Sequence, residues 1–308
     1  MNSEFLIEKL FELNGHSAAI YSLDHFSNSP NYIYTAAGDG FIARWDLTKK
    51  TQDAFSIRLN ASSYALKCID STSYLVAGLS TGNVHIVDVE NKKEIAHLKY
   101  HTTGILSIQV NLSKMHLYIT DAIGNLSIWN INNFTFLMSL PLDCGKIRHI
   151  ELLENGARIA VCCQDGFVKI FETDYYNEVI GRKINDQGVN FFKSFPQKQG
   201  LGILGGKDGF LHLVSTENLE EIHNFPAHNF AVYQIAFHPD SILFATVSRD
   251  KSLKIWNSTN LSLIKKLERL QGGHTHSINC VKWISNEKLV TVGDDKRVVV
   301  WGISNIFV

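Results

Sequence analysis

Two short clusters in this 308-residue chain contain residue types that could do chemistry. Gly78-Leu79-Ser80-Thr81-Gly82 matches the G-x-S-x-G pattern of a nucleophilic serine, and His274, His276 and Cys280 carry groups that bind zinc. The serine pattern needs a strand-to-helix turn, whereas here it joins two strands. The His/Cys group lies along one strand region, with no second cluster nearby in the sequence. We therefore predict no catalytic residue, no metal site and no cofactor.

The strands around these residues belong to a repeating unit, whose clearest copy lies late in the chain. Two apolar runs, Val232–Phe237 and Ile242–Val247, flank the turn-forming His238-Pro239-Asp240. A polar turn at residues 248–251 then leads to a third strand that ends at Trp256. This order predicts short antiparallel strands joined by tight turns.

The same turn and the same strand end recur along the whole chain. The turns lie at Asp39-Gly40, Thr81-Gly82, Ile123-Gly124, Asp165-Gly166, Asp208-Gly209, Asp250-Lys251 and Asp295-Lys296. Five residues after each turn lie Trp45, Val87, Trp129, Phe171, Val214, Trp256 and Trp301. Successive turns are 42 to 45 residues apart. A period of roughly 40–45 residues with several strands per unit is typical of β-propeller blades.

Paired motifs at the blade boundaries make the chain similar to the WD-repeat family. A Gly-His pair occurs at Gly15-His16 and Gly273-His274, and the Trp-Asp pair is intact at Trp45-Asp46. Degenerate forms of the second pair occur at Trp129-Asn130, Trp256-Asn257 and Trp301-Gly302. The resemblance covers the chain and implies an all-β fold, a seven-bladed β-propeller of four-stranded antiparallel blades. Residues 1–308 are expected to form one domain.

The two ends of the chain predict how the ring closes. Residues about 4–13 read as a strand without a unit of its own, and the last unit has three strands instead of four. We expect the N-terminal strand to pair with the last blade, because closure removes unpaired sheet edges.

The resemblance also implies a buried hydrogen-bond network in each well-formed blade. In the family it joins the blade-opening His, a Ser or Thr, the turn Asp and the Trp. The sixth unit supplies all four as His228, Ser248, Asp250 and Trp256. At the hydroxyl position the first unit has Ala37 and the seventh has Gly293, so their networks are expected to be incomplete.

Composition limits the possible partners and location. A formal net charge of −1 argues against a broadly basic surface that binds nucleic acid. No apolar run approaches the ~18–20 residues of a membrane span. Glu4 and Glu8 interrupt the apolar N-terminal stretch, which argues against a secretory signal. Five cysteines without framework spacing indicate buried thiols. We expect a cytoplasmic protein with no membrane partner.

Function is then expected to lie in the loops at one end of the ring. The resemblance implies a non-catalytic scaffold that docks a protein or peptide on its top face, at residues predicted to be Lys207, Arg249, Phe230, His276, Tyr64 and Gln164. Exposed aromatic residues and Arg are enriched at binding hot spots. The alternative is a propeller enzyme or small-ligand binder, with its site at the mouth of the central channel.

Overall fold

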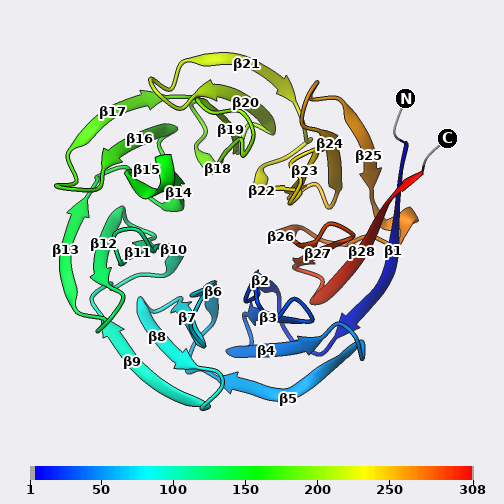
Figure 1. Ribbon diagram of the computed structural model, residues 1–308, viewed down its shortest axis with the longest axis horizontal. Coiled ribbons are helices and arrows are strands. Elements are labelled where there is room, and N and C mark those ends of the chain that lie inside the picture. Colours follow the sequence, from blue (N-terminus) through cyan, green and yellow to red (C-terminus); the bar gives the residue numbers. More distant parts are fainter. Residues whose placement is uncertain (1–3, 307–308) are drawn as a thin grey trace.

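The computed structural model describes residues 4–306, which form a ring of seven four-stranded antiparallel sheets around a central axis (Figure 1). Each sheet is one blade; in six of them the strands follow one another outward in chain order, and in the seventh the outermost strand is β1. The seven-bladed β-propeller predicted from the turn spacing is therefore confirmed. No helix in the described part of the chain is long and apolar enough to cross a membrane.

The first three blades follow each other without interruption. Blade one contains β2 (Ile20–Asp24), β3 (Tyr32–Ala37), β4 (Phe41–Asp46) and β5 (Thr51–Arg58). Blade two contains β6 (Ser63–Cys68), β7 (Tyr74–Leu79), β8 (Asn83–Asp88) and β9 (Lys93–Lys99). Blade three contains β10 (Ile105–Asn111), β11 (His116–Asp121), β12 (Asn125–Asn130) and β13 (Phe136–Pro141).

Two short 3-10 helices occur in the second half of the ring. Blade four contains β14 (Ile147–Leu153), η1 (Glu154–Gly156), β15 (Arg158–Cys163), β16 (Phe167–Glu172) and β17 (Glu178–Lys183). Blade five contains β18 (Val189–Ser194), β19 (Leu201–Gly206), β20 (Phe210–Ser215) and β21 (Glu221–Pro226). Blade six contains β22 (Val232–Phe237), β23 (Leu243–Ser248), β24 (Leu253–Asn257) and β25 (Leu263–Leu267), followed by η2 (Arg269–Gln271). Blade seven contains β26 (Ile278–Ser285), β27 (Lys288–Gly293), β28 (Arg297–Ile306) and β1 (Glu4–Asn14).

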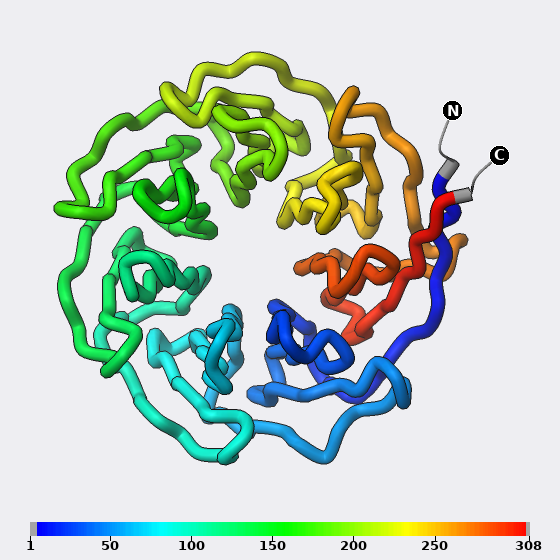
Figure 2. The backbone as a smooth tube through the Cα atoms, viewed as in Figure 1, coloured from blue at the N-terminus to red at the C-terminus, as the bar shows by residue number. Residues whose placement is uncertain are grey.

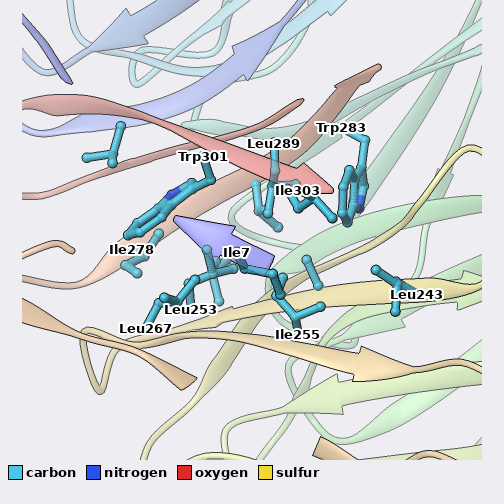
Figure 3. Packing of buried hydrophobic residues seen from close by; sticks show 14 residues of the cluster. Ile7, Leu243, Leu253, Ile255, Leu267, Ile278, Trp283, Leu289, Trp301 and Ile303 are labelled. Atoms are coloured by element: carbon cyan, nitrogen blue, oxygen red, sulfur yellow. The ribbon is translucent and has the colours of Figure 1, made fainter. Parts of the chain in front are cut away.

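The ring closes through β1, which is the outermost strand of blade seven. It pairs antiparallel with β28, with Glu4 opposite Ile306 and Asn14 opposite Arg297. The two described chain ends therefore lie side by side at the rim (Figure 2). Ile7 of β1 is buried in a cluster that joins blades six and seven (Figure 3). The predicted closure by the N-terminal strand is confirmed.

The core consists of apolar layers between neighbouring blades rather than one central cluster. Between blades two and three, for example, Val76 and Ile86 pack with Ile105 and Ile119. Strands covered on both faces in this way are buried throughout, as β23 is, because both faces lie against another sheet.

The tight turns between the second and third strands of the blades need left-handed backbone. At Gly166 φ is +92°, and a Cβ there would lie 1.8 Å from the Asn185 carbonyl oxygen of the next blade. That turn therefore tolerates only glycine. In blades six and seven Lys251 and Lys296 take the same role, with φ of 72° and 67°.

Candidate functional site

The top face is defined here as the end of the ring that carries the turns between second and third strands and the loops leading into the innermost strands. A cavity of about 510 Å³ runs along the axis between the innermost strands and includes the mouth of the channel at the top face. Its volume lies in the range of small-molecule and peptide side-chain pockets.

Every innermost strand has a β-bulge directly after its first residue. The bulged residues have no partner on the neighbouring strand, and all seven line the cavity. These residues, named here the mouth ring, are Tyr21, Tyr64, Leu106, Arg148, Asn190, Tyr233 and Asn279. A bulge re-aims one side chain and is frequent beside functional sites. The fold thus presents one unpaired residue of each blade to the channel mouth.

Arg148 is the cation of the mouth ring. Within residues 4–306, its guanidinium makes no ion pair and no hydrogen bond. Burial lowers its pKa, although the neighbouring Tyr233 acts in the opposite direction. Five N–H donors are therefore held in a partly dry cavity without an acceptor. Such a group is suited to receive a carboxylate or phosphate from a ligand.

Three tyrosines supply the aromatic part of the mouth ring. Tyr21 and Tyr64 meet edge to face, with ring centroids 5.0 Å apart. Burial raises the pKa of Tyr21 and of Tyr233, so both hydroxyls stay protonated at neutral pH. Gly104 leaves the room that the Tyr64 ring occupies, since a Cβ there would lie 3.1 Å from it. Tyrosine combines an apolar ring with a hydrogen-bonding tip, which suits a binding surface.

Two asparagines of the mouth ring hold neighbouring blades together. The side-chain amide of Asn190 donates to the Val232 carbonyl, and that of Asn279 donates to the Ile20 carbonyl, both at 2.9 Å. Asn279 also donates to a carboxylate oxygen of Asp294 at 2.7 Å. These bonds fix the spacing of the blades around the tyrosines and Arg148.

The predicted docking residues are all present on this end of the ring, but only some come together. Tyr64 belongs to the mouth ring rather than to a loop. Phe230 is 57% exposed, and the Arg249 guanidinium lies 5.9 Å from its ring centroid. Arg249 and Arg148 both lower the pKa of Tyr233, against the larger effect of burial, which places Arg249 beside the mouth ring. Phe230, Arg249, Tyr233 and Arg148 therefore lie near one another at the channel mouth.

Of the remaining predicted residues, Lys207 lies on a turn beside Phe230, whereas, within residues 4–306, Gln164 and His276 make no hydrogen bond or aromatic contact with these four residues. The turn carrying Lys207 packs against the Phe230 loop, since a Cβ on Gly209 would lie 3.3 Å from the Phe230 carbonyl oxygen. Gln164 accepts a hydrogen bond from the Lys146 backbone, and exposed His276 contacts the Thr275 hydroxyl. In the described part of the chain, no hydrogen bond or aromatic contact links Gln164 or His276 to Phe230 or Arg249.

Sequence reasoning missed Arg148, Tyr21 and Tyr233. The turn motifs do not mark them, because they lie on the innermost strands, and a bulge cannot be seen in an apolar alternation. Their common position, one residue after the first residue of each innermost strand, becomes visible only when the strands are aligned by their pairing.

The buried network of blade six differs from the expectation in one residue. His228 Nδ1 lies 3.0 Å from Asp250, while its Nε2 lies 2.8 Å from the Thr246 hydroxyl, which also accepts the Trp256 indole N–H at 2.9 Å. The expectation of Ser248 was wrong. Ser248 lies at the end of the strand, level with the turn, and its hydroxyl bonds the backbone of Asp250 and Phe230 instead. The His228 imidazole bonds the residue two positions earlier on the same face of the strand, which is Thr246.

The corrected position makes the network complete in more blades than expected. Ala37 and Gly293 are not at the hydroxyl position, which Thr35 and Thr291 occupy. The hydroxyl bridges His and Trp in His16–Thr35–Trp45, His101–Ser127–Trp129 and His274–Thr291–Trp301, with distances of 2.7–2.9 Å. Because every donor and acceptor is satisfied, these buried groups rigidify the blades that carry them.

Ion pairs connect the innermost strands of neighbouring blades. Lys282 pairs with Asp24, and Lys193 lies 3.0 Å from Glu151. Burial alone would raise the pKa of Glu151, but Lys193, His149 and hydrogen bonds lower it to about 2. The pKa of Asp24 is also lowered, by Lys282 and Lys67 against burial. Neither carboxyl group can therefore hold a proton at neutral pH for general acid catalysis.

The ring of antiparallel four-stranded blades and the His–hydroxyl–Trp network define a β-propeller of the WD type. The family model "WD domain, G-beta repeat" matches residues 7–46, 219–257 and 264–302. The chain therefore contains WD repeats in three places.

Several curated proteins are similar to this chain at low identity. The WD repeat-containing protein 55 homolog of Dictyostelium discoideum is 23% identical over 76% of this chain and 56% of its own length. Eukaryotic translation initiation factor 3 subunit I of Nematostella vectensis is 23% identical over 80% of this chain and 83% of its own. A p21-activated protein kinase-interacting protein 1-like of Danio rerio is 23% identical, covering 93% and 76%. The chain spans about half of the first relative's length.

Proposed function

We propose that this protein is a non-catalytic interaction scaffold that docks a protein segment across its top face. The contact patch consists of Phe230, Arg249, Tyr233 and Arg148, and it continues into the Tyr21–Tyr64 side of the mouth ring. The preferred segment carries an acidic side chain, which enters the channel mouth and pairs with Arg148.

The observation that carries this proposal is the unpaired Arg148 guanidinium among tyrosines. Withdrawing a guanidinium from water without an acceptor costs free energy, and an anionic side chain from a partner recovers that cost. The flanking Tyr233 and Phe230 offer rigid aromatic surface, and Arg249 lies at their edge. Aromatic residues and Arg around a desolvated pocket are the composition of a binding hot spot.

The names of two relatives agree with this mode of action. One is a subunit of a translation initiation factor and another is named for its interaction with a kinase. Those partners belong to those proteins, and we transfer only the general property of binding other proteins. The five cysteines, all unpaired and buried, support the further proposal that the protein works in the cytoplasm.

The alternative of an enzyme or small-ligand site has the central cavity in its favour. However, Asp24 and Glu151 are held ionised by lysines, and the seven mouth-ring residues are aromatic, aliphatic, amide or cationic, although His149, Cys280 and Asp294 line the same cavity. Docking therefore accounts for more of the side chains at the channel mouth than catalysis does.

The test is affinity purification from the native host with mass spectrometry, using the full chain and an Arg148→Ala/Arg249→Ala variant. Arg182→Ala, on the outer strand β17, is the matched control because it removes an Arg of the rim. We expect a partner recovered with the unaltered chain and the control and lost with the double variant. A partner kept by all three chains would place the interface elsewhere. No specific partner with the unaltered chain would remove support for the scaffold.

A further inference from the structure

Two histidines face each other on the outer half of blade two. His85 of β8 lies directly opposite His97 of β9 in the strand register, and their rings stack with centroids 4.3 Å apart. A bulge between Ile86 and Val87 brings Glu94 beside them, with an oxygen 2.7 Å from His85 Nδ1. One ligand atom from each of these three residues lies within 4.8 Å of the other two. These residues, His85, Glu94 and His97, are named the blade-two triad.

Part of this arrangement is a structural feature that other blades share. At the same position blade four pairs Lys169 with Glu178 at 3.1 Å, and blade five pairs His212 with Glu221 at 2.5 Å. Blades two, four and five are those in which Val87, Phe171 and Val214 replace the strand-end tryptophan. A cation–carboxylate pair at this position is thus common to the blades that lack the tryptophan. The pair of His85 with Glu94 alone therefore indicates packing and not a site.

The third residue distinguishes blade two. The residue opposite the cation is His97 in blade two, Gly181 in blade four and Asn224 in blade five. Gly181 has no ligand atom, and an amide is a poor ligand for transition metals. The triad is therefore a departure from the pattern of the equivalent blades, and it adds a second imidazole.

The hydrogen bonds of His85 are also incomplete. In blade five the second ring nitrogen of His212 lies 2.9 Å from the Asp208 carboxylate. The equivalent nitrogen of His85, Nε2, is buried and has no hydrogen-bond partner within the described residues. With Nδ1 donating to Glu94, a lone pair remains on Nε2 without a donor. Such a buried polar atom costs free energy unless something occupies it.

Two members of the triad are open to solvent. Glu94 and His97 are exposed, so an ion can reach them from solvent and their side chains can adjust.

We propose that the blade-two triad is a binding site for a divalent transition metal, Zn²⁺ in the first place. Two imidazoles and one carboxylate are a ligand set used by zinc, with a fourth position left for water or for a group from a partner. Ligand atoms around tetrahedral Zn²⁺ lie about 3.3 Å apart. In this structure the two imidazole rings stack, Glu94 bonds His85 Nδ1, and His97 Nε2 lies 3.2 Å from Asn83 Oδ1. Binding therefore requires that the exposed Glu94 and His97 side chains rotate. The ion would fasten β9, the outermost strand, to β8. This proposal differs from the expectation drawn from the sequence, which was that the protein binds no metal.

The test compares the full chain with two variants by calorimetric titration with ZnCl₂ and by absorption spectroscopy with Co²⁺. His97→Asn gives blade two the side chain of blade five and should weaken binding at least about tenfold. His223→Asn removes an exposed histidine of β21 and is the matched control, so its affinity should stay unchanged. We expect one Zn²⁺ per chain, a visible Co²⁺ spectrum of a four-coordinate site, and loss of both in His97→Asn.

Three results would overturn the proposal. The first is equal Zn²⁺ affinity in His97→Asn and the unaltered chain, which would place bound zinc on other residues. The second is that the unaltered chain binds no Zn²⁺ at about 100 μM ZnCl₂ and pH 7.5. This concentration is well above the dissociation constants of specific zinc sites. A Glu94→Gln variant that still binds like the unaltered chain would remove the carboxylate from the ligand set and contradict the triad.

Discussion

Glu151 of blade four and Lys193 of blade five form an ion pair of 3.0 Å across the boundary between their blades. Glu151 also accepts hydrogen bonds from the backbone and the hydroxyl of Ser194. One buried carboxylate thus connects the innermost strands of blades four and five by directional bonds, which apolar packing does not provide.

This pair predicts a specific dependence of stability on pH. The folded-state pKa of Glu151 is about 2, compared with its usual 4.5. Because the folded-state pKa is the lower one, its contribution is complete above pH 4.5 and is lost as the pH falls towards 2. The difference corresponds to about 3 kcal/mol. Urea unfolding between pH 6 and pH 2.5 should show a steeper loss for the unaltered chain than for Glu151→Gln. Equal slopes would assign the acid sensitivity to other carboxylates.

The corrected network predicts which hydroxyl of β23 matters. Thr246→Val leaves the Trp256 indole N–H and His228 Nε2 buried without partners, which costs about 1–3 kcal/mol of unfolding free energy. Ser248→Ala, two residues along the same strand, should cost less, since its hydroxyl bonds backbone groups at the exposed turn. Chemical denaturation of both variants is the measurement. A greater loss for Ser248→Ala would restore the original interpretation.

Ring closure predicts a contrast between neighbouring residues of β1. Ile7 is buried between blades six and seven, whereas Leu6 is 45% exposed. Ile7→Ala should lower the free energy of unfolding by about 2–5 kcal/mol. Leu6→Ala should change it by less than about 0.5 kcal/mol. Similar effects of the two substitutions in thermal or urea unfolding would contradict the observed register of β1.

Arg148 predicts a conflict between stability and binding. Its guanidinium is partly desolvated without an acceptor, so Arg148→Met should raise the free energy of unfolding by about 1 kcal/mol. The same variant should lose the partner that the unaltered chain recovers. Urea unfolding and co-purification measure the two effects. A destabilised Arg148→Met variant would show that Arg148 supports the fold rather than a ligand.

The sequence was sufficient for the architecture because its signals are local. Turn residues such as Asp39-Gly40 repeat at a constant period, and each turn fixes the strands on both sides of it. The candidate site depended on pairing between strands, which a period does not contain. One unpaired residue moves the following side chains to the other face, so Arg148 was not recognised.

The same limit explains the other two differences. Thr246 and Ser248 lie on one face of β23, and only the depth to which His228 reaches decides between them. His85 and His97 are twelve residues apart in the chain, and they meet because a bulge sets the register of β8 against β9. The number of residues between two histidines in the chain does not reveal how close their side chains lie in the fold.

The mouth ring also has a consequence for the engineering of this protein. Its seven side chains project from bulges, and each belongs to a different blade. Apart from Asn190 and Asn279, which bond the next blade, they can be exchanged without breaking a ladder of the sheets. The other five positions can therefore be randomised together in a mutant library, from which variants with new binding specificities are selected while the blades stay unchanged. These positions are Tyr21, Tyr64, Leu106, Arg148 and Tyr233.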